Sequence, residues 1–386
     1  MITIPQYESM LSIYLCVLAA LPSMALGLLG KKSRLLNAAA SAFVIFSILG
    51  LHSLQLFEFL LFTAFELGIV YFYFYFQKRC GSQAVYHLVF ALSMLPLLIV
   101  RASAGSDTLA RYFGFTGLSY ICFKIWQILM DIHDQKLEAL PILDVLGLIL
   151  FFPSFSSGPI ARYQSFKEES ESTRRGSAYF EAYIVPGAWK LLQGLFYKFA
   201  AAFAVNTYIL AKIPEEATLF RAVLYMYAYT VYLFFDFAGY SRIAVGIGCL
   251  MGVRLPENFD KPFLACNMKE FWARWHMSLS SWFNDYVFGR FVLNNVRNGL
   301  FKSPKAAARW AYLFTMTTMG LWHGFSLHYL VYGLYEGGLL VITDIYVKSK
   351  HYRNLRKKPY YKPLSRAVCF QFIAFGMLLF SGRYLF

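Results

Sequence analysis

The chain has 386 residues, of which 58% are hydrophobic and only 15% are charged, against roughly 25% charged residues in soluble domains. Apolar runs long enough to cross a hydrocarbon core of ~30 Å recur along it. This composition excludes an ordinary soluble enzyme and predicts an all-α polytopic membrane protein, with residues 1–386 forming one integral membrane domain. The formal net charge of +15 is clustered, and because nothing resembles a nucleic-acid-binding module, we expect no nucleic-acid partner.

Hydrophobic runs predict about eleven membrane spans in chain order, with ends good to about two to four residues. The expected spans are 9–29, 35–52, 55–77, 84–100, 112–131, 139–156, 184–211, 219–239, 305–323, 327–347 and 365–386. The segment 241–253 is too short to cross alone, so we expect it to be re-entrant or interfacial.

Basic residues predict the orientation of these spans. The first eight residues contain no Lys or Arg, so we expect a retained first span and no cleavable signal. Lys31, Lys32 and Arg34 follow the first span, and positive loops remain cytoplasmic. The basic Lys348–Lys362 loop is then cytoplasmic, and both termini lie outside a multi-pass protein of the cell (plasma) membrane.

The stretch from Pro256 to Tyr286 is the most polar and tryptophan-rich part of an otherwise apolar chain. Asn267 and Glu270 have the spacing of a capping box, which predicts a helix start. The apolar side chains that follow have helical spacing: Trp272, Trp275, Leu279, Trp282 and Phe283. The pattern predicts one amphipathic helix whose tryptophans lie at the membrane interface.

A second basic and aromatic segment follows this stretch. Its cations and apolar residues alternate between Arg290 and Lys305, and we take these as candidates for docking a partner: Arg290, Phe291, Val292, Arg297, Lys302 and Lys305. The same pattern also fits a helix on the membrane surface.

Two histidines are the candidate chemical centre. His323 closes an apolar span between Trp322 and Gly324, and a histidine with a pKa near 6.5 can accept a proton from a hydroxyl as general base. The alternative is a structural histidine at a helix end, where a cation suits the helix dipole. His276 has the same two interpretations, and its polar neighbours Ser278 and Asn284 favour a polar cluster.

Asp236 ends an aromatic span, where an acid is costly and therefore a candidate functional residue. A structural pair with Arg242 is the competing interpretation. Six scattered cysteines and two distant histidines give no metal-ligand spacing, and there is no serine-nucleophile elbow, so we predict neither a metal site nor a hydrolase nucleophile.

Several of these motifs together resemble the membrane-bound O-acyltransferase (MBOAT) superfamily. The resemblance rests on the segments Pro256–Phe259, Phe271–His276, Leu321–Gly324 and Asp236–Ser241. Phe151–Pro153, Ser157–Tyr163 and Tyr332–Tyr335 are similar to the branch that D-alanylates teichoic acids of Gram-positive cell walls (DltB-like proteins).

The resemblance implies a funnel-shaped helical bundle with interfacial helices and a central tunnel that contains His323. It maps His323 onto the catalytic histidine and His276 onto the second histidine. Asp236, Trp322, Ser278 and Asn284 are then candidates for contacting substrate or lining the tunnel.

The donor implied by the resemblance is D-alanine held as a thioester on the phosphopantetheine arm of an acidic carrier protein, and no cofactor is bound by this chain. The acceptor hydroxyl lies on lipoteichoic acid or a small membrane partner, and other membrane proteins of the pathway are expected partners in the lipid bilayer. Two alternatives stay open at this point: a polysaccharide O-acetyltransferase of the same superfamily, and a transporter or flippase without acyl chemistry.

Overall fold

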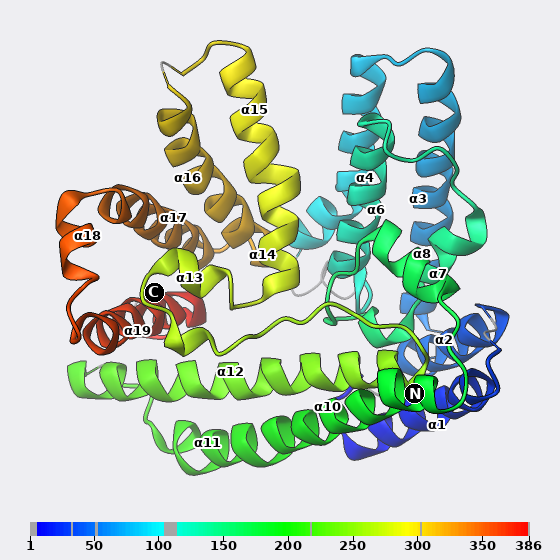
Figure 1. Ribbon diagram of the computed structural model, residues 1–386, viewed down its shortest axis with the longest axis horizontal. Coiled ribbons are helices and arrows are strands. Elements are labelled where there is room, and N and C mark those ends of the chain that lie inside the picture. Colours follow the sequence, from blue (N-terminus) through cyan, green and yellow to red (C-terminus); the bar gives the residue numbers. More distant parts are fainter. Residues whose placement is uncertain are drawn as a thin grey trace. The chain divides into compact units, whose positions relative to one another are not determined.

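The computed structural model describes residues 6–31, 34–50, 53–103, 114–216, 218–301 and 303–384. Helices make up nearly all of its regular structure (Figure 1), and one isolated bridge joins Phe259 to Trp275 in the described part of the chain. The contacts divide the chain into two compact units. Unit 1 contains Met1–Leu195 and Tyr240–Pro256, and unit 2 contains Phe196–Gly239 and Glu257–Phe386.

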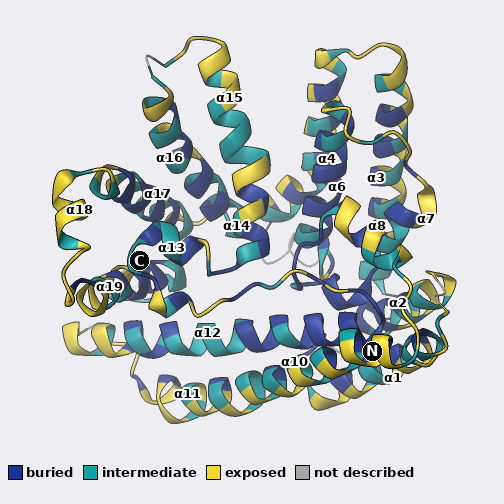
Figure 2. Ribbon diagram, in the orientation of Figure 1, coloured by how far each residue is buried: buried dark blue, intermediate teal, exposed yellow. Residues whose placement is uncertain are grey.

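Unit 1 contains most of the first half of the chain. Its helices are α1 (Met10–Leu28), α2 (Arg34–Leu49), α3 (Leu54–Arg79), α4 (Gln83–Ser103), α6 (Leu118–His133), α7 (Ile142–Ile149), α8 (Tyr163–Glu171), α9 (Ser177–Tyr179), η2 (Phe180–Ile184) and α10 (Val185–Leu195). The helices α3, α4 and α6 pack against one another. Residues on nearly every side of α6 are buried, so it is the buried helix of this group (Figure 2).

A charged side chain lies inside this apolar packing. The Lys124 side chain on α6 is fully buried and donates hydrogen bonds to the Leu148 carbonyl oxygen at 2.9 Å and to Ser154 Oγ at 3.0 Å. Both acceptors belong to the segment that follows α6, so these hydrogen bonds fix that segment against the helix. Buried polar groups are retained where they are paired in this way.

Unit 2 contains the candidate site residues. Its helices are η3 (Phe196–Ala202), α11 (Phe203–Tyr208), α13 (Met268–Trp272), α14 (Met277–Phe283), η6 (Asn284–Phe288), α15 (Gly289–Arg297), α16 (Pro304–His323), α17 (Leu327–Val347), α18 (Lys350–Leu355) and α19 (Tyr361–Ser381), together with the first part of α12 (Leu219–Leu250). The helices α16 and α17 form the closest pair (Figure 1). At their crossing Gly320 lies against the Tyr329 carbonyl and within reach of the Gly333 Cα, an approach that any side chain at position 320 would block.

Local signals explain where several long helices begin. The hydroxyls of Ser9, Ser53 and Ser303 each cap the helix that follows by accepting a hydrogen bond from the backbone N–H three residues later. At α16, Pro304 occupies the first helical position, where its missing N–H has no intrahelical partner.

Seven helical segments in the described ranges are long and apolar enough to cross a membrane: Met10–Leu28, Leu54–Arg79, Gln83–Ser103, Ser177–Lys212, Leu219–Leu250, Leu327–Val347 and Tyr361–Ser381. Arg34–Leu49 is a shorter apolar helix. The all-α, multi-pass architecture is therefore confirmed, while the count of eleven spans and the tunnel stay predictions.

Two predicted segments differ from the structure. The expected span 139–156 contains only the eight-residue helix α7, followed by the 3-10 turn Phe152–Ser154, because Pro153 cannot continue the α7 hydrogen-bond ladder. The separate segment predicted at 241–253 is wrong, since α12 continues without interruption through Leu250. Gly239 lies inside this helix, where a single glycine is tolerated.

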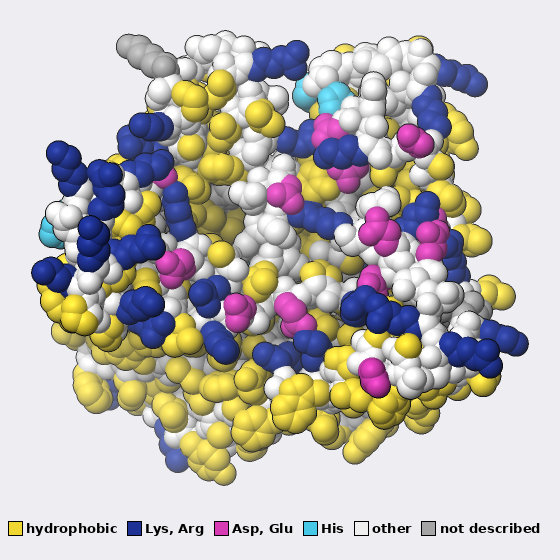
Figure 3. Space-filling view, in the orientation of Figure 1, with side chains coloured by type: hydrophobic (Ala, Val, Ile, Leu, Met, Phe, Trp, Pro, Cys, Tyr) yellow, Lys and Arg dark blue, Asp and Glu magenta, His cyan; other side chains and the backbone are white. Residues whose placement is uncertain are grey.

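The basic residues near the end of the chain gather around α18 (Figure 3). They are Lys348, Lys350, Arg353, Arg356, Lys357, Lys358 and Lys362. This strongly positive surface belongs to the loop that the sequence places on the cytoplasmic side.

Candidate active site

His276 lies at a sharp change of direction between two short helices. It is the N-cap of α14 and has φ 45° and ψ 50°, the left-handed conformation that non-glycine residues rarely adopt. Its side chain is 5% exposed, and its ring packs edge-on against Phe237 at 4.7 Å between centroids. Strained residues of this kind cluster at functional sites.

Asn258 holds the backbone on the far side of this turn. Its carbonyl oxygen accepts a hydrogen bond from Met277 N at 3.0 Å. Its side-chain oxygen accepts two more, from Ser278 N at 3.1 Å and Ser278 Oγ at 2.6 Å. Together with the bridge between Phe259 and Trp275, these bonds hold the chain before and after His276 and so maintain its left-handed conformation.

His276 Nδ1 is buried without a hydrogen-bond partner in the described part of the chain. Burial, and to a smaller extent the charge of His323, lowers the pKa of His276 to about 3. The imidazole is therefore neutral at physiological pH, with a ring nitrogen available to a ligand.

His323 is the last residue of α16 and is half-buried among aromatic rings. Its imidazole contacts Trp322 edge-on at 4.5 Å, Phe380 edge-on at 4.9 Å and Tyr329 nearly parallel at 5.7 Å between centroids. The rings come from α16, α17 and α19, so three helices hold the imidazole. Side chains supported from several elements in this way are well positioned for chemistry.

A buried carboxyl group, that of Glu336, anchors the indole of Trp272. Trp272 Nε1 donates a hydrogen bond of 3.0 Å to Glu336 Oε2, and Glu336 is 1% exposed on α17. Trp272, Trp275 and Trp282 are all buried within the protein, so the prediction that these tryptophans lie at the membrane interface is wrong. Their side chains hold the short helices α13 and α14 inside unit 2.

The predicted single amphipathic helix over this region is also wrong. Asn267 does cap a helix, since its Oδ1 accepts the Glu270 N–H at 3.0 Å as the sequence predicted. That helix, α13, ends at Trp272, and the left-handed His276 separates it from α14. The hydrogen bonds that Asn258 accepts from Met277 and Ser278 compensate for the lost helical continuity.

The three other residues predicted to contact substrate, Trp322, Ser278 and Asn284, have different surroundings. Trp322 contacts the His323 ring, whereas Ser278 is occupied by Asn258 and supports the turn. Asn284 is exposed at the start of η6 and donates to Asp285 Oδ1 at 3.1 Å. Of these three, the structure brings only Trp322 into contact with a histidine.

Asp236 on α12 forms an ion pair with Lys198 on η3, at 2.6 Å between Oδ1 and Nζ. The sequence suggested Arg242 as the structural partner, and the structure instead has Arg242 donating a hydrogen bond to Gln193. Lys198 and Asp236 lie on different helices, so the spacing of residues in the sequence could not predict that they pair.

The candidate docking residues surround the hairpin of α15 and α16. Phe291 stacks on Phe314 at 5.1 Å between centroids, and the Arg290 guanidinium lies 5.9 Å from the Tyr286 ring. Val292 is half-buried, and Arg297 and Lys305 are exposed. Lys302 lies outside the described residues.

A cation cluster that the sequence analysis missed joins α13, α16 and the C-terminal end of α17. Asp344 on α17 is 2% exposed and pairs with Lys269 at 2.7 Å and with Lys348 at 2.6 Å. Arg309 Nε lies 3.9 Å from the same carboxylate and is buried without a hydrogen bond in the described part of the chain. Three cations around one carboxylate leave a net positive charge, which suits an anionic ligand.

Comparison with known proteins identifies the family. The family model of MBOAT, the membrane-bound O-acyltransferase family, matches residues 46–385. The chain belongs to the membrane-bound O-acyltransferase family. It is therefore a membrane-bound acyltransferase, and the match includes the described residues around both histidines.

Curated relatives refine this assignment. The chain is 35% identical to a teichoic acid D-alanyltransferase of Bacillus subtilis (strain 168), over 98% of each chain. It is 33% identical to the protein of that name from Streptococcus thermophilus, over 88% of this chain and 86% of the relative. A probable alginate O-acetylase of Pseudomonas syringae is 29% identical over 69% of this chain but only 49% of its own length. The whole-length resemblance is thus to the D-alanyltransferases.

Proposed function

We propose that this acyltransferase moves D-alanine from a carrier-protein thioester on the cytoplasmic side to a hydroxyl acceptor of lipoteichoic acid, directly or through a small partner protein. The observation that carries the proposal is the whole-length similarity to teichoic acid D-alanyltransferases. The two histidines of unit 2, each held by aromatic rings, support it, because acyl transfer to a hydroxyl needs a positioned base.

In the proposed reaction His323 is the general base. Its imidazole takes the proton of the acceptor hydroxyl while the hydroxyl oxygen attacks the thioester carbonyl carbon. A C–O bond forms, the C–S bond breaks, and the departing thiolate takes the proton back from His323. Since a thioester is already activated, a base and an oriented acceptor suffice without a covalent enzyme intermediate.

His276 has a different part in this proposal. Burial lowers the pKa of its side chain to about 3, so it is a poor proton acceptor at neutral pH. Its buried Nδ1, which has no hydrogen-bond partner in the described part of the chain, is instead suited to receive a hydrogen bond from substrate. We assign His276 to orienting substrate beside the base.

The cations around Asp344 support a carrier-bound donor. Arg309 lies fourteen residues before His323 on α16, which corresponds to roughly 21 Å along the helix axis. A phosphopantetheine arm has a phosphate at its base and the thioester at its far end, so Lys269, Arg309 and Lys348 are candidates for holding the phosphate while the thioester reaches His323. The basic surface around α18 and the candidate docking residues of α15 and α16 suit an acidic carrier.

The test is transfer from radiolabelled D-alanyl carrier protein in membranes that contain the wild-type chain, His323→Ala or His323→Gln. We expect both variants to lose about 10²-fold or more in rate while they still bind the carrier. His87→Gln, a change at an exposed histidine of α4 outside the proposed docking surface, is the matched control and should transfer at the wild-type rate.

Three outcomes would decide against parts of the proposal. Near wild-type transfer by His323→Gln would make His323 structural. No transfer by the wild type in a complete system, combined with transfer from an acetyl donor, would favour the O-acetyltransferase alternative, to which the alginate O-acetylase relatives have a partial likeness. Movement of the acceptor across the membrane without acyl transfer would favour the transporter.

A further inference from the structure

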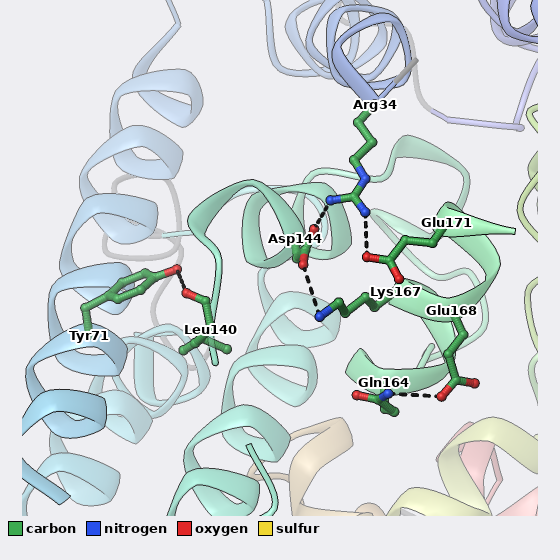
Figure 4. Close-up of polar contacts among 8 residues, drawn as sticks. All are labelled: Arg34, Tyr71, Leu140, Asp144, Gln164, Lys167, Glu168 and Glu171. Atoms are coloured by element: carbon green, nitrogen blue, oxygen red, sulfur yellow. Dashed lines mark hydrogen bonds and ion pairs between the residues drawn. The ribbon is translucent and has the colours of Figure 1, made fainter. Parts of the chain in front are cut away.

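The cations at the start of α2 and on α8 belong to an ion-pair network that is complete in itself (Figure 4). Arg34 pairs with Asp144 on α7 and, at 2.7 Å between Nη2 and Oε1, with Glu171 on α8. The Lys167 ammonium lies 3.8 Å from Asp144 Oδ2. Since each of these cations faces a carboxylate, the network joins three helices of unit 1 and leaves no net positive charge for a ligand.

Arg383, two residues after the end of α19 in unit 2, has no such partner. Its Nη2 donates a hydrogen bond of 2.9 Å to the Ile213 carbonyl oxygen, and its guanidinium lies 4.7 Å from the centre of the Tyr225 ring and 5.0 Å from that of Tyr384. Among the described residues, no acidic side chain lies within ion-pair distance of it. Because a guanidinium has five N–H donors, its charge and several of its donors remain for an anion.

The acids closest to this contact in the sequence do not neutralise the guanidinium. The turn that accepts its hydrogen bond continues into Glu215 and Glu216, which are both exposed. Glu216 pairs with Arg221 at 2.8 Å, and water and salt screen the exposed carboxylate of Glu215. Arg383 itself is half-buried, and a partly buried charge is screened less. A half-buried cation without an acid beside it suits an anionic ligand.

Arg383 is also close to the proposed base. Phe380, three residues earlier, packs edge-on against the His323 ring at 4.9 Å between centroids. Three residues of chain span at most about 11 Å, so the backbone of Arg383 lies no farther than that from the backbone of Phe380. The cation and the base therefore belong to one region of unit 2.

The turn before Arg383 is held against the aromatic residues around His323. Gly382 ends α19 with φ 69°, and a Cβ on it would lie 3.2 Å from Cγ of His328. The His328 ring packs on Tyr329 at 4.1 Å between centroids, and Tyr329 is the ring that lies nearly parallel to the imidazole of His323. These contacts hold the backbone beside Arg383 in place relative to the base, as the orientation of a substrate requires.

We propose that Arg383 is a binding site for an anionic group of the acceptor, and that this group is a phosphodiester of a polyol phosphate chain. The inference rests on the proposed function, in which the acceptor is a teichoic acid, because such polymers are polyols joined by phosphodiesters. One anionic group recurs in every repeat. A cation held near the base can therefore bind the chain while a hydroxyl of a nearby repeat reaches His323.

Two features of the site favour this ligand. A guanidinium offers parallel N–H donors that match the oxygens of a phosphate group. The orientation predicted from the basic loops puts this end of α19 on the outer side of the membrane, where a cell-wall polymer lies. Arg383 then positions the acceptor and takes no part in the proton transfer.

Three single changes separate the charge of Arg383 from its packing. Arg383→Gln removes the charge and keeps a side chain that donates hydrogen bonds. Tyr384→Phe removes the hydroxyl that bonds to the Pro214 carbonyl oxygen and leaves the guanidinium in place. Arg366→Gln, near the other end of α19, is the matched control, because its Nε likewise donates to a backbone carbonyl, that of Leu264 at 3.1 Å.

The first measurement is the fluorescence anisotropy of a labelled glycerol phosphate oligomer titrated with the full-length protein in detergent. We expect Arg383→Gln to weaken binding about tenfold, the effect of losing one charge-assisted hydrogen bond, while Arg366→Gln and Tyr384→Phe bind as the wild type does. Added salt should weaken binding by the wild type and have little effect on Arg383→Gln, because it screens the charge that this variant lacks. An uncharged polyglycerol oligomer should bind equally weakly to both proteins.

The second measurement is transfer of D-alanine from the carrier to the same oligomer. Arg383→Gln should raise the KM for the oligomer about tenfold and leave kcat and the KM for the carrier near the wild-type values, because a phosphate contact acts equally in the ground and transition states. If the wild type transfers nothing while binding still depends on Arg383, the failure lies with the proposed reaction and the binding site stands.

The proposal is overturned if Arg383→Gln binds the oligomer as tightly as the wild type. It is also overturned if Tyr384→Phe weakens binding as much as Arg383→Gln, since Arg383 would then act only by anchoring the turn. Tighter binding of dioleoylphosphatidylglycerol or of a partner protein than of the oligomer likewise contradicts it. If Arg383→Gln unfolds at a lower temperature than the wild type, the salt response of the wild type and its preference for the charged oligomer decide.

Discussion

The side-chain oxygen of Asn258 accepts both the backbone N–H and the hydroxyl of Ser278, the residue two places after His276. Asn258 itself is 1% exposed, so this pair of bonds is shielded from water. One buried amide therefore fixes where α14 begins, and with it the direction in which the His276 ring points.

We predict that Asn258→Ala lowers kcat for acyl transfer at least tenfold and leaves the KM for the carrier nearly unchanged. Loss of the acceptor leaves the buried Ser278 N–H unpaired, at a cost of about 1–3 kcal/mol, and releases the strained turn at His276. Initial rates over a range of carrier concentrations measure both constants.

Two further changes at this pair act as controls. Asn258→Asp keeps an acceptor oxygen and should recover much of kcat, and Ser278→Ala removes only the hydroxyl bond and should have a small effect. A wild-type kcat for Asn258→Ala would contradict the positioning role of this residue.

His276 should make the folded protein sensitive to acid. Its folded pKa of about 3 lies below the usual value of 6.5, so the unfolded chain binds one more proton between these two pH values. Stability therefore rises with pH across this window and falls as the pH is lowered. At pH 5 the loss relative to pH 7 is about 2 kcal/mol from this group alone.

The variant His276→Asn cannot take up that proton and should flatten the dependence of the unfolding midpoint on pH between 4 and 7. Wild type and variant are compared by thermal unfolding in detergent. An equally steep dependence in both proteins would show that another group titrates there.

The stability of the protein should fall more when one partner of the Asp236–Lys198 ion pair is removed than when both are removed. The two side chains are 32% and 13% exposed, so Lys198→Met strands a carboxylate in apolar surroundings. We expect it to cost about 3 kcal/mol and to reduce the amount of folded protein in membranes.

The double change Lys198→Met with Asp236→Leu removes both charges and should restore most of that amount. Fluorescence-detected size exclusion of the four proteins completes a double-mutant cycle. Additive effects of the two single changes would mean that the pair does not couple.

The cations around Asp344 give a prediction about the carrier. Lys269→Gln should raise the KM for the D-alanyl carrier about tenfold with kcat within about twofold of wild type, since a phosphate contact acts equally in the ground and transition states. Lys212→Gln, at an exposed lysine outside the basic surface around α18, is the comparison for a general loss of charge. A fall in kcat at unchanged KM would exclude phosphate binding by Lys269.

Local features of the sequence were sufficient for much of the fold. The capping pair Asn267 and Glu270 involves residues three apart, so its hydrogen bonds follow from the sequence alone. The placement of His323 at the end of an apolar helix was equally local. The break at His276 could not be predicted this way, because it depends on hydrogen bonds accepted by Asn258, eighteen residues earlier.

The other contacts that the sequence did not predict join residues that are far apart in the chain. Lys198 and Asp236 are 38 residues apart, and Lys269 and Asp344 are 75 apart, so no spacing rule brings either pair together. The interfacial placement of Trp272 failed for a related reason. A tryptophan that finds a buried acceptor such as Glu336 no longer needs the membrane interface for its N–H.

The close crossing of α16 and α17 at Gly320 has a consequence for how the family can diversify. His323 lies one helical turn after Gly320, and its position is therefore set by main-chain atoms of α17 that every substitution leaves in place. Side chains of α17 away from this crossing can therefore change without moving the main chain that carries His323, while the orientation of its imidazole still depends on the Trp322, Tyr329 and Phe380 rings. Under the proposed reaction, the main-chain position of the base is then kept while the side chains that contact donor and acceptor change.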